Sequence, residues 1–161
     1  MKKYKITPRP YKISDAQALA NIYYYTIHHI NIRDYSIEQV NAWAPSSCLE
    51  LDGWKKKWEK LPPIVATLND EIVGFTEFES SGHIDCFYVH HQHQGKGVGS
   101  VLMAAIDANA KKNNIIRLYS EVSITAKPFF EKMGFAIIKK QLVNIRGCEL
   151  TNFIMEKITT I

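Results

Sequence analysis

Cysteine is scarce in this sequence, and its placement argues against a disulfide scaffold and a zinc site. Only three cysteines occur in 161 residues, at Cys48, Cys86 and Cys148, and no two of them have the C-x-x-C spacing. An odd number of scattered cysteines predicts free thiols and favours a cytoplasmic location. The three histidines of segment 90–93 share one short loop with no second group of ligands, so we expect no metal.

The sequence also lacks a long apolar run, a leader-like start and a strong charge bias. No run approaches the roughly 20 apolar residues of a membrane-spanning helix, and residues 1–4 have no apolar segment of the signal-peptide kind. The net charge is only +4, and the densest basic cluster, 55–57, between Trp54 and Trp58, is typical of a solvated helix face. We therefore expect neither a membrane nor a nucleic acid as a partner.

The remaining pattern predicts a single domain spanning residues 1–161, with 46% hydrophobic residues. Capping boxes are expected at 14–17 and 36–39. Periodicity predicts strands at 4–11, 64–68, 72–79, 83–89, 116–122, 135–143 and 148–157, and helices at 14–30, 36–44, 52–60, 98–112 and 126–133. The fold is then α+β with a mostly antiparallel sheet. A crossover helix makes strands 83–89 and 116–122 parallel.

Glycine is concentrated at one junction between a strand and a helix. Of eight glycines, Gly95, Gly97 and Gly99 fall within five residues. Glycine lets backbone N–H groups approach a ligand closely, and the start of the following helix adds a partial positive charge. This junction therefore predicts an anion site, most naturally for phosphate.

Three kinds of phosphate-binding loop are candidates for this junction. The P-loop pattern GxxxxGK[ST] is absent, and the dinucleotide pattern GxGxxG has neither the required spacing nor its early βαβ unit. The pattern Gln-x-x-Gly-x-Gly is met by Gln94, Gly97 and Gly99. It resembles the pyrophosphate loop of the GNAT superfamily of acyl-CoA-dependent N-acyltransferases.

A second motif supports the same resemblance. The family pattern Asn-x-x-Ala-x-x-Phe-Tyr-Glu-Lys-x-Gly-Phe is matched over 123–135 by Ser-Ile-Thr-Ala-Lys-Pro-Phe-Phe-Glu-Lys-Met-Gly-Phe. The resemblance extends from the first strand to Lys157, and the chain looks most like small bacterial acetyltransferases. It implies a three-layer α/β arrangement with about seven strands flanked by helices, splayed between strands 83–89 and 116–122.

The resemblance also implies where acetyl-CoA, the expected cosubstrate, would bind. Acetyl-CoA would lie in the V between the splayed strands. Its pyrophosphate would meet backbone N–H groups of 94–99, its pantetheine arm would pair with the free edge of strand 83–89, and the Val89 amide region would polarise the thioester. The implied cofactor-binding residues are Phe87, Tyr88, Val89, Gln94, Gly95, Lys96, Gly97, Val98, Gly99, Ser100, Ser123, Ala126, Phe129 and Phe130. Lys127 could also approach the phosphates of the cosubstrate.

Acylation of an amine needs a base, because an alkyl ammonium carries a proton at neutral pH. Strict alternation would place His83, Asp85, Phe87 and Val89 on one face of their strand. Asp85 and His83 are the candidate catalytic residues, and Asp85 is favoured because it interrupts an apolar strand. The neighbouring strand offers two further candidates, Glu77 and Glu79.

The main departure from the family pattern is Phe130, which stands where the family has a tyrosine acting as general acid. A thiol leaving group has a pKa near 8.5, so a thiolate can depart without that acid. Tyr119, Tyr88 or water could supply the proton instead. Ser123 replaces the family's asparagine and keeps a hydroxyl that can cap the following helix.

The acceptor is expected to meet Arg33 and Tyr35, two residues of a predicted loop. The resulting hypothesis is an N-acetyltransferase that moves the acetyl group to a small-molecule or peptide amine by direct attack. Cys86 is then a core residue and not a nucleophile. The alternative hypothesis is a non-catalytic acyl-CoA-binding sensor, supported by Phe130. The sequence allows a homodimer.

Overall fold

A computed structural model describes residues 4–159 of the chain. Seven strands form two sheets, and every pairing within a sheet is antiparallel. The first sheet has the order β1-β2-β3-β4 and the second has the order β5-β7-β6. The strands are β1 (Ile6–Pro10), β2 (Ile64–Leu68), β3 (Glu71–Phe78), β4 (Ile84–Val89), β5 (Arg117–Ser123), β6 (Ala136–Ile145) and β7 (Cys148–Ile158).

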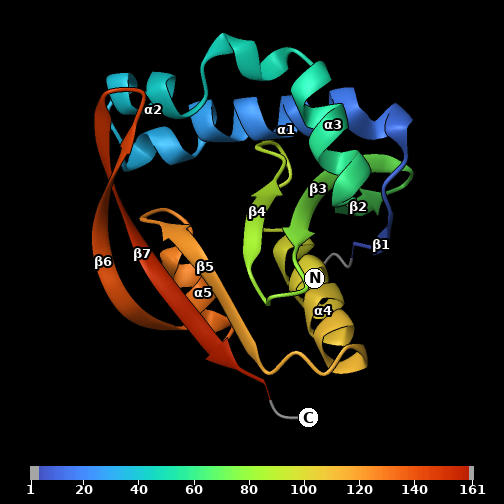
Figure 1. Cartoon of the computed structure of the whole chain (residues 1–161). Coiled ribbons are helices and arrows are strands. Elements are labelled where there is room, and N and C mark those ends of the chain that lie inside the picture. The colour runs from blue at the N-terminus through green and yellow to red at the C-terminus, as the bar shows by residue number, and fades with distance from the viewer. Residues whose placement is uncertain (1–3, 160–161) are drawn as a thin grey trace.

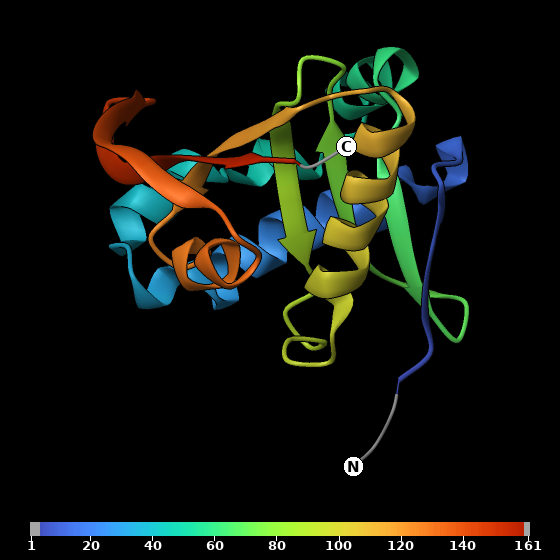
Figure 2. The same ribbon diagram turned by 90° about the horizontal axis from the view of Figure 1, so that it is seen from below.

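Helices cover both faces of these sheets, as Figures 1 and 2 show. The helices are α1 (Ala16–His29), α2 (Ile37–Trp43), α3 (Asp52–Lys60), α4 (Val98–Lys112) and α5 (Lys127–Lys132). The first three lie on one side and α4 lies on the other. Met103 and Ile106 of α4 are buried in one core cluster, whereas Leu19 of α1 and Trp58 of α3 are buried in another. The predicted α+β fold of seven strands flanked by helices is confirmed.

Within the described residues, the two sheets meet only at one end, between β4 and β5. His83 and Tyr119 form a single parallel bridge, the Tyr119 N–H donates to the Gly82 carbonyl at 3.1 Å, and the Ser120 hydroxyl donates to the Ile84 carbonyl at 2.7 Å. Beyond these contacts the two strands diverge toward α1 (Figure 1). The predicted parallel splay between these strands is confirmed, and it leaves an open V.

The two capping boxes expected from the sequence had different outcomes. At the start of α2, Ser36 and Gln39 bond reciprocally, with the Gln39 N–H donating to the Ser36 hydroxyl at 3.1 Å. The box expected at Ser14 is wrong. Asp15 instead accepts hydrogen bonds from the Lys12 N–H and the Arg9 guanidinium, which hold the entry to α1.

A bulge in β4 changes which side chains share a face. Phe78 pairs with Ile84 but Thr76 pairs with Phe87, so two residues, Asp85 and Cys86, stand opposite Glu77. One extra residue breaks the two-residue alternation. Ile84 and Phe87 consequently pack on the α4 side, while Cys86 packs beside α1 and α3.

The expectation that His83, Asp85, Phe87 and Val89 share one face is therefore wrong. The bulge turns Asp85 toward α3, where its carboxylate contacts Lys57. No helix among residues 4–159 is both long enough and apolar enough to cross a membrane.

Candidate active site

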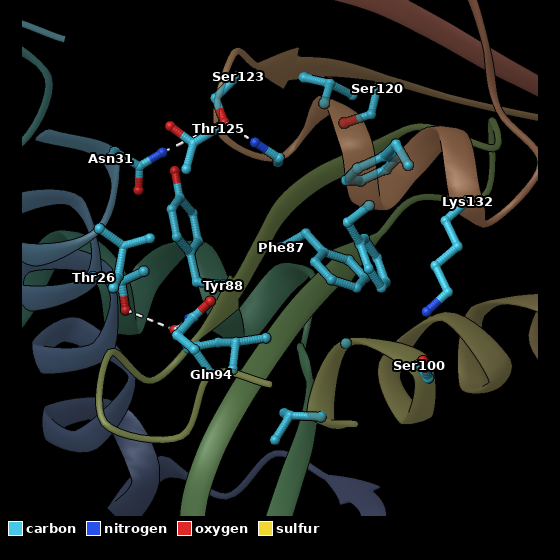
Figure 3. Close-up of a pocket in the computed structure, with 18 of the residues that line it drawn as sticks. Thr26, Asn31, Phe87, Tyr88, Gln94, Ser100, Ser120, Ser123, Thr125 and Lys132 are labelled. Atoms are coloured by element: carbon cyan, nitrogen blue, oxygen red, sulfur yellow. Dashed lines mark hydrogen bonds between the residues drawn. The ribbon is translucent and has the colours of Figure 1, made fainter. Parts of the chain in front are cut away.

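The V between β4 and β5 contains a cavity of about 380 Å³, here called the cleft. Figure 3 shows its lining, with side chains from α1, β4, β5, α5 and the glycine loop. Of the predicted cofactor-binding residues, all but Lys96 line the cleft, namely Phe87, Tyr88, Val89, Gln94, Gly95, Gly97, Val98, Gly99, Ser100, Ser123, Ala126, Phe129 and Phe130. Lys96 instead lies over the ring of Tyr4 and 3.1 Å from His93.

The glycine loop shapes the wide end of the cleft. Gly95 and Gly97 have φ values of +72° and +91°, which glycine adopts without strain. Gly97 immediately precedes α4, so the N–H groups of the first helical turn have no partner within the helix. The loop is closed by the Gln94 side chain, whose amide donates to the Val89 carbonyl at 2.8 Å. The arrangement suits an anion such as a pyrophosphate.

The edge of β4 that faces the cleft is free. The His90 N–H donates to the Val73 carbonyl of β3 at 2.8 Å. Because bonding direction alternates along an antiparallel strand, the N–H groups of Phe87 and Val89 point away from β3. The Val89 carbonyl is already held by the hydroxyl of Thr26 at 2.9 Å. The free N–H groups can therefore bind an extended amide chain.

Aromatic rings form the wall between β4 and α5. The Phe87 ring lies 5.5 Å from both the Phe129 and the Phe130 rings, measured between centroids. Phe130 is only 2% exposed and offers no proton. Of the two tyrosines considered as its substitute, Tyr88 lines the cleft, whereas the hydroxyl of Tyr119 lies 3.4 Å from Ser81 at the closed end.

Several residues of the cleft carry no motif and were missed by sequence reasoning, including Thr26, Asn31, Ser120, Glu121, Thr125 and Lys132. Asn31 donates to the Ser123 hydroxyl at 3.4 Å, and that hydroxyl caps α5 by accepting from the Ala126 N–H at 3.0 Å. Lys132 extends from α5 toward Ser100 at the start of α4 (Figure 3). Lys127, the lysine suggested by the sequence, pairs with Glu131 at 3.5 Å instead.

A second cavity of about 240 Å³ adjoins the cleft. Its walls include the aromatic residues Tyr23, Tyr35, Trp43 and Trp54, so it is called the aromatic cavity. The two cavities share five lining residues, Trp43, Asp85, Tyr88, Glu121 and Ser123. A molecule in the aromatic cavity can therefore reach one bound in the cleft.

Asp85 stands at this junction, and a cation lies beside it. Lys57 Nζ is 2.8 Å from the Asp85 carboxylate and 2.9 Å from the Glu77 carboxylate. The Asp85 side chain is 40% exposed, whereas that of Glu77 is completely buried. Asp85 is thus the carboxylate of the pair that an incoming amine can approach.

His83, the other predicted base, lies at the closed end of the V and lines neither cavity. Its two ring nitrogens face the carboxylates of Glu79 and Glu121, the latter at 2.8 Å. Burial alone would lower the pKa of His83, but these two partners outweigh burial and raise the pKa. A base role for His83 has no geometric support here, because the ring is held by carboxylates on both sides.

The two residues predicted to contact the acceptor amine differ in position. Tyr35 lines the aromatic cavity, but its hydroxyl is occupied: it donates to the Thr151 carbonyl at 2.6 Å and accepts from the Ile124 N–H at 2.9 Å. Arg33 lines neither cavity. Tyr35 can therefore offer its ring to an acceptor and use its hydroxyl to hold β7 against the end of β5.

Cys86 also borders the aromatic cavity and is 6% exposed. Burial raises the pKa of the Cys86 thiol well above its usual value. A thiol that stays protonated is a poor nucleophile. Its burial thus favours a core role for Cys86 over a nucleophilic one.

Comparisons with known proteins identify the family of this chain. The Acetyltransferase (GNAT) domain model matches residues 31–157. An uncharacterized N-acetyltransferase of Escherichia coli (strain K12), YafP, is 33% identical over 147 residues, covering 91% of this chain and 92% of that protein. A GCN5-related N-acetyltransferase from Rhodopseudomonas palustris superposes with a TM-score of 0.89 at 31% identity, covering 99% of this chain and 98% of that one.

A more distant structure has the same fold. The PaiA N-acetyltransferase from Thermoplasma acidophilum, solved in complex with coenzyme A, is 19% identical and superposes with a TM-score of 0.75, covering 96% of this chain and 99% of that one. The family model covers most of the chain, and the two relatives above 30% identity cover nearly all of it. The chain belongs to the GNAT superfamily of acetyl-CoA-dependent N-acetyltransferases.

Proposed function

We propose that this acetyltransferase acts on a small primary amine, which binds as an ammonium ion in the aromatic cavity and attacks the thioester directly. The observation that carries this proposal is the wall shared by the two cavities, to which Asp85, Glu121, Trp43 and Tyr88 all contribute. Carboxylates attract an ammonium ion, and aromatic faces stabilise it further. A cavity of about 240 Å³ suits a small molecule better than a peptide chain.

Acetyl-CoA would supply the activated acetyl group from the cleft, held by the glycine loop, the β4 edge and the Phe87–Phe129 wall. The proposed base is Asp85, which takes a proton from the ammonium directly or through one water. The neutral nitrogen then has a lone pair for the acetyl carbon, and the bond from that carbon to sulfur breaks. The departing thiolate takes a proton from solvent or from Tyr88.

All residues in this scheme come from one chain. The residues that line the two cavities span Tyr23 to Asn152. We therefore propose that one domain, residues 1–161, carries the whole activity, whether or not the protein forms a homodimer. Light scattering at the assay concentration, together with activity measured across dilution, tests this point.

The test of the proposed function is release of coenzyme A from acetyl-CoA against a panel of amines, amino acids and peptides. Small primary amines should give the highest kcat/KM. Asp85→Asn should lower kcat/KM by about 10²-fold or more, as expected for loss of a general base, without weakening acetyl-CoA binding. Asp107→Asn is the matched control, because Asp107 of α4 pairs with Lys157 of β7 and lies outside both cavities.

Two outcomes would overturn the proposal. A protein that acetylates peptides in preference to every small amine would refute the acceptor class. Full activity in Asp85→Asn with an unchanged pH profile would refute the base.

A further inference from the structure

Glu77 is a fully buried carboxylate that the scheme above does not use. Its side chain is 0% exposed and it lines neither cavity. A buried carboxylate is costly unless it is paired and hydrogen-bonded. Glu77 has one partner of each kind, both from α3: Lys57 Nζ forms an ion pair with it at 2.9 Å, and the Trp58 indole N–H donates a hydrogen bond to it at 3.3 Å.

Lys57 connects this buried group to the active site. Its ammonium is bonded to Asp85 at 2.8 Å as well as to Glu77, and it lies 5.6 Å from the centre of the Trp54 ring. Lys57 and Asp85 both line the aromatic cavity. The order from the interior to the cavity is therefore Glu77, then Lys57, then Asp85.

The β4 bulge brings these three residues together. Because Asp85 and Cys86 both stand opposite Glu77, Asp85 is turned toward α3 and its carboxylate approaches that of Glu77. The side-chain ligand atoms of Glu77, Asp85 and Cys86 all lie within 4.8 Å of one another. The Lys57 ammonium bonds to both carboxylates of this group, so it supplies the positive charge there.

Lys57 is the cation that contacts both acidic side chains of this group. Burial alone would lower the pKa of Lys57, but the negative groups around it, including Asp85 and Glu77, outweigh burial and raise the pKa. Lys57 thus remains an ammonium ion. Cys86 remains neutral, because burial and the charge of Glu77 raise the pKa of its thiol. The Lys57 ammonium is thus shared between the side chains of Glu77 and Asp85.

We propose that Glu77 is a positioning residue, which holds Lys57 toward the interior and so leaves Asp85 an oxygen free to accept the proton of the amine. This proposal rests on the base role proposed for Asp85. If Glu77 lost its charge, Lys57 would be drawn fully to Asp85. The ammonium would then stabilise the ionised carboxylate and make it a weaker base.

Other titratable groups also face Asp85 and must stay constant in a test. They come from α1, the segment before α2, β4 and β5, and are Tyr23, Tyr35, Cys86, Tyr88 and Glu121. Exchanging Glu77 for glutamine leaves all of them in place. A shift in the pH profile can then be assigned to Glu77.

The experiment is the pH profile of kcat/KM for the best amine in the panel. In Glu77→Gln, the acid limb should move to lower pH by about one unit, because a negative charge near Asp85 is lost. The plateau should fall several-fold, because the weaker base accepts a proton less readily. Lys57→Met should move the acid limb in the opposite direction, because Asp85 then faces Glu77 without the cation.

Glu156→Gln is the matched control for this experiment. Glu156 pairs with Arg117 at 2.6 Å on the second sheet and lines neither cavity. The acid limb of the Glu156→Gln profile should coincide with that of the wild type. Thermal melting of each variant shows whether it is folded, and Lys57→Met, whose residue is partly exposed, tests the proposal even if Glu77→Gln does not fold.

The outcomes separate this proposal from the one on which it rests. Opposite shifts in the two variants support the positioning role. An acid limb that stays in place in Lys57→Met, or in a folded Glu77→Gln, overturns the positioning role. Asp85 still stands as the base in that case, provided that Asp85→Asn removes the limb. A limb that persists in Asp85→Asn overturns both.

Discussion

Gly99 lies so close to the ring of Phe129 that no side chain fits between them. A Cβ atom at position 99 would come within 2.9 Å of the Phe129 Cε1 and Cζ atoms. Real Cβ atoms do not approach another atom this closely, so the ring would have to move. Since both residues line the cleft, the absence of a side chain at Gly99 sets the position of one cleft wall.

Gly99→Ala should therefore weaken acetyl-CoA binding by about tenfold, or about 1.4 kcal/mol, because the displaced Phe129 ring changes the cleft. Calorimetric titration measures the affinity. Gly53→Ala is the matched control, because the added methyl group meets open space at the start of α3 and alanine forms helix more readily than glycine. Equal affinities in the wild type and Gly99→Ala would show that Phe129 moves without affecting the cleft.

The cleft was predictable from the sequence because its main determinants are local. Gly95 and Gly97 have backbone angles that favour glycine, and Gly97 directly precedes α4. Each element adjoining the loop was also recognisable from its own residues. The order of the elements then fixed the parallel splay, since a right-handed crossover joins β4 to β5.

The cluster of Glu77, Lys57 and Asp85 could not be predicted from the sequence, because its residues come from three separate elements, β3, α3 and β4. Lys57 ends a run of three lysines that is typical of a solvated helix face, and only the position of α3 brings it to Glu77. The bulge at Asp85 adds one residue to β4, and no local pattern marks it. A strict two-residue alternation therefore assigned Asp85 to the wrong face.

The lysine that lines the cleft differs from the two that the sequence suggests, for a physical reason. The sequence places Lys96 in the glycine loop and Lys127 at the start of α5, both suited to a phosphate contact. The structure turns Lys96 toward Tyr4 and pairs Lys127 with Glu131. Lys132, five positions after Lys127, is the lysine that lines the cleft. A helix face cannot be oriented from spacing alone in an element of six residues.

Lys132→Met should lower the affinity for coenzyme A several-fold, because its ammonium reaches toward the start of α4, where an anion is expected (Figure 3). Affinity should also fall less steeply with added salt, since one charged contact to phosphate is lost. Lys127→Met, on the same helix, should bind like the wild type.

A pantetheine fragment without phosphates distinguishes charge from packing in this experiment. If Lys132 acts through its charge, the variant and the wild type should bind the fragment equally. Equal losses for the fragment and for coenzyme A would mean that the side chain acts by packing.

His83 and its two carboxylate partners should make the closed end of the V sensitive to pH. Burial disfavours the charged imidazole, but Glu79 and Glu121 together raise the pKa of His83 above its ordinary value. A group whose pKa is higher in the folded state contributes stability below its unfolded pKa, and this contribution is lost as pH rises through the folded pKa. His83→Gln should consequently lower the melting temperature more at about pH 6 than at about pH 9.

The partner carboxylates provide the control for this prediction. In a Glu121→Gln background, one of the two groups that raise the pKa of His83 is gone, so the His83→Gln penalty should depend less on pH. An equal loss of melting temperature at both pH values in the wild-type background would show that His83 acts by packing against Tyr119, whose ring centroid lies 5.1 Å from its own. A loss of melting temperature mainly at the lower pH would instead show that an imidazolium ion between two carboxylates stabilises the closed end of the V.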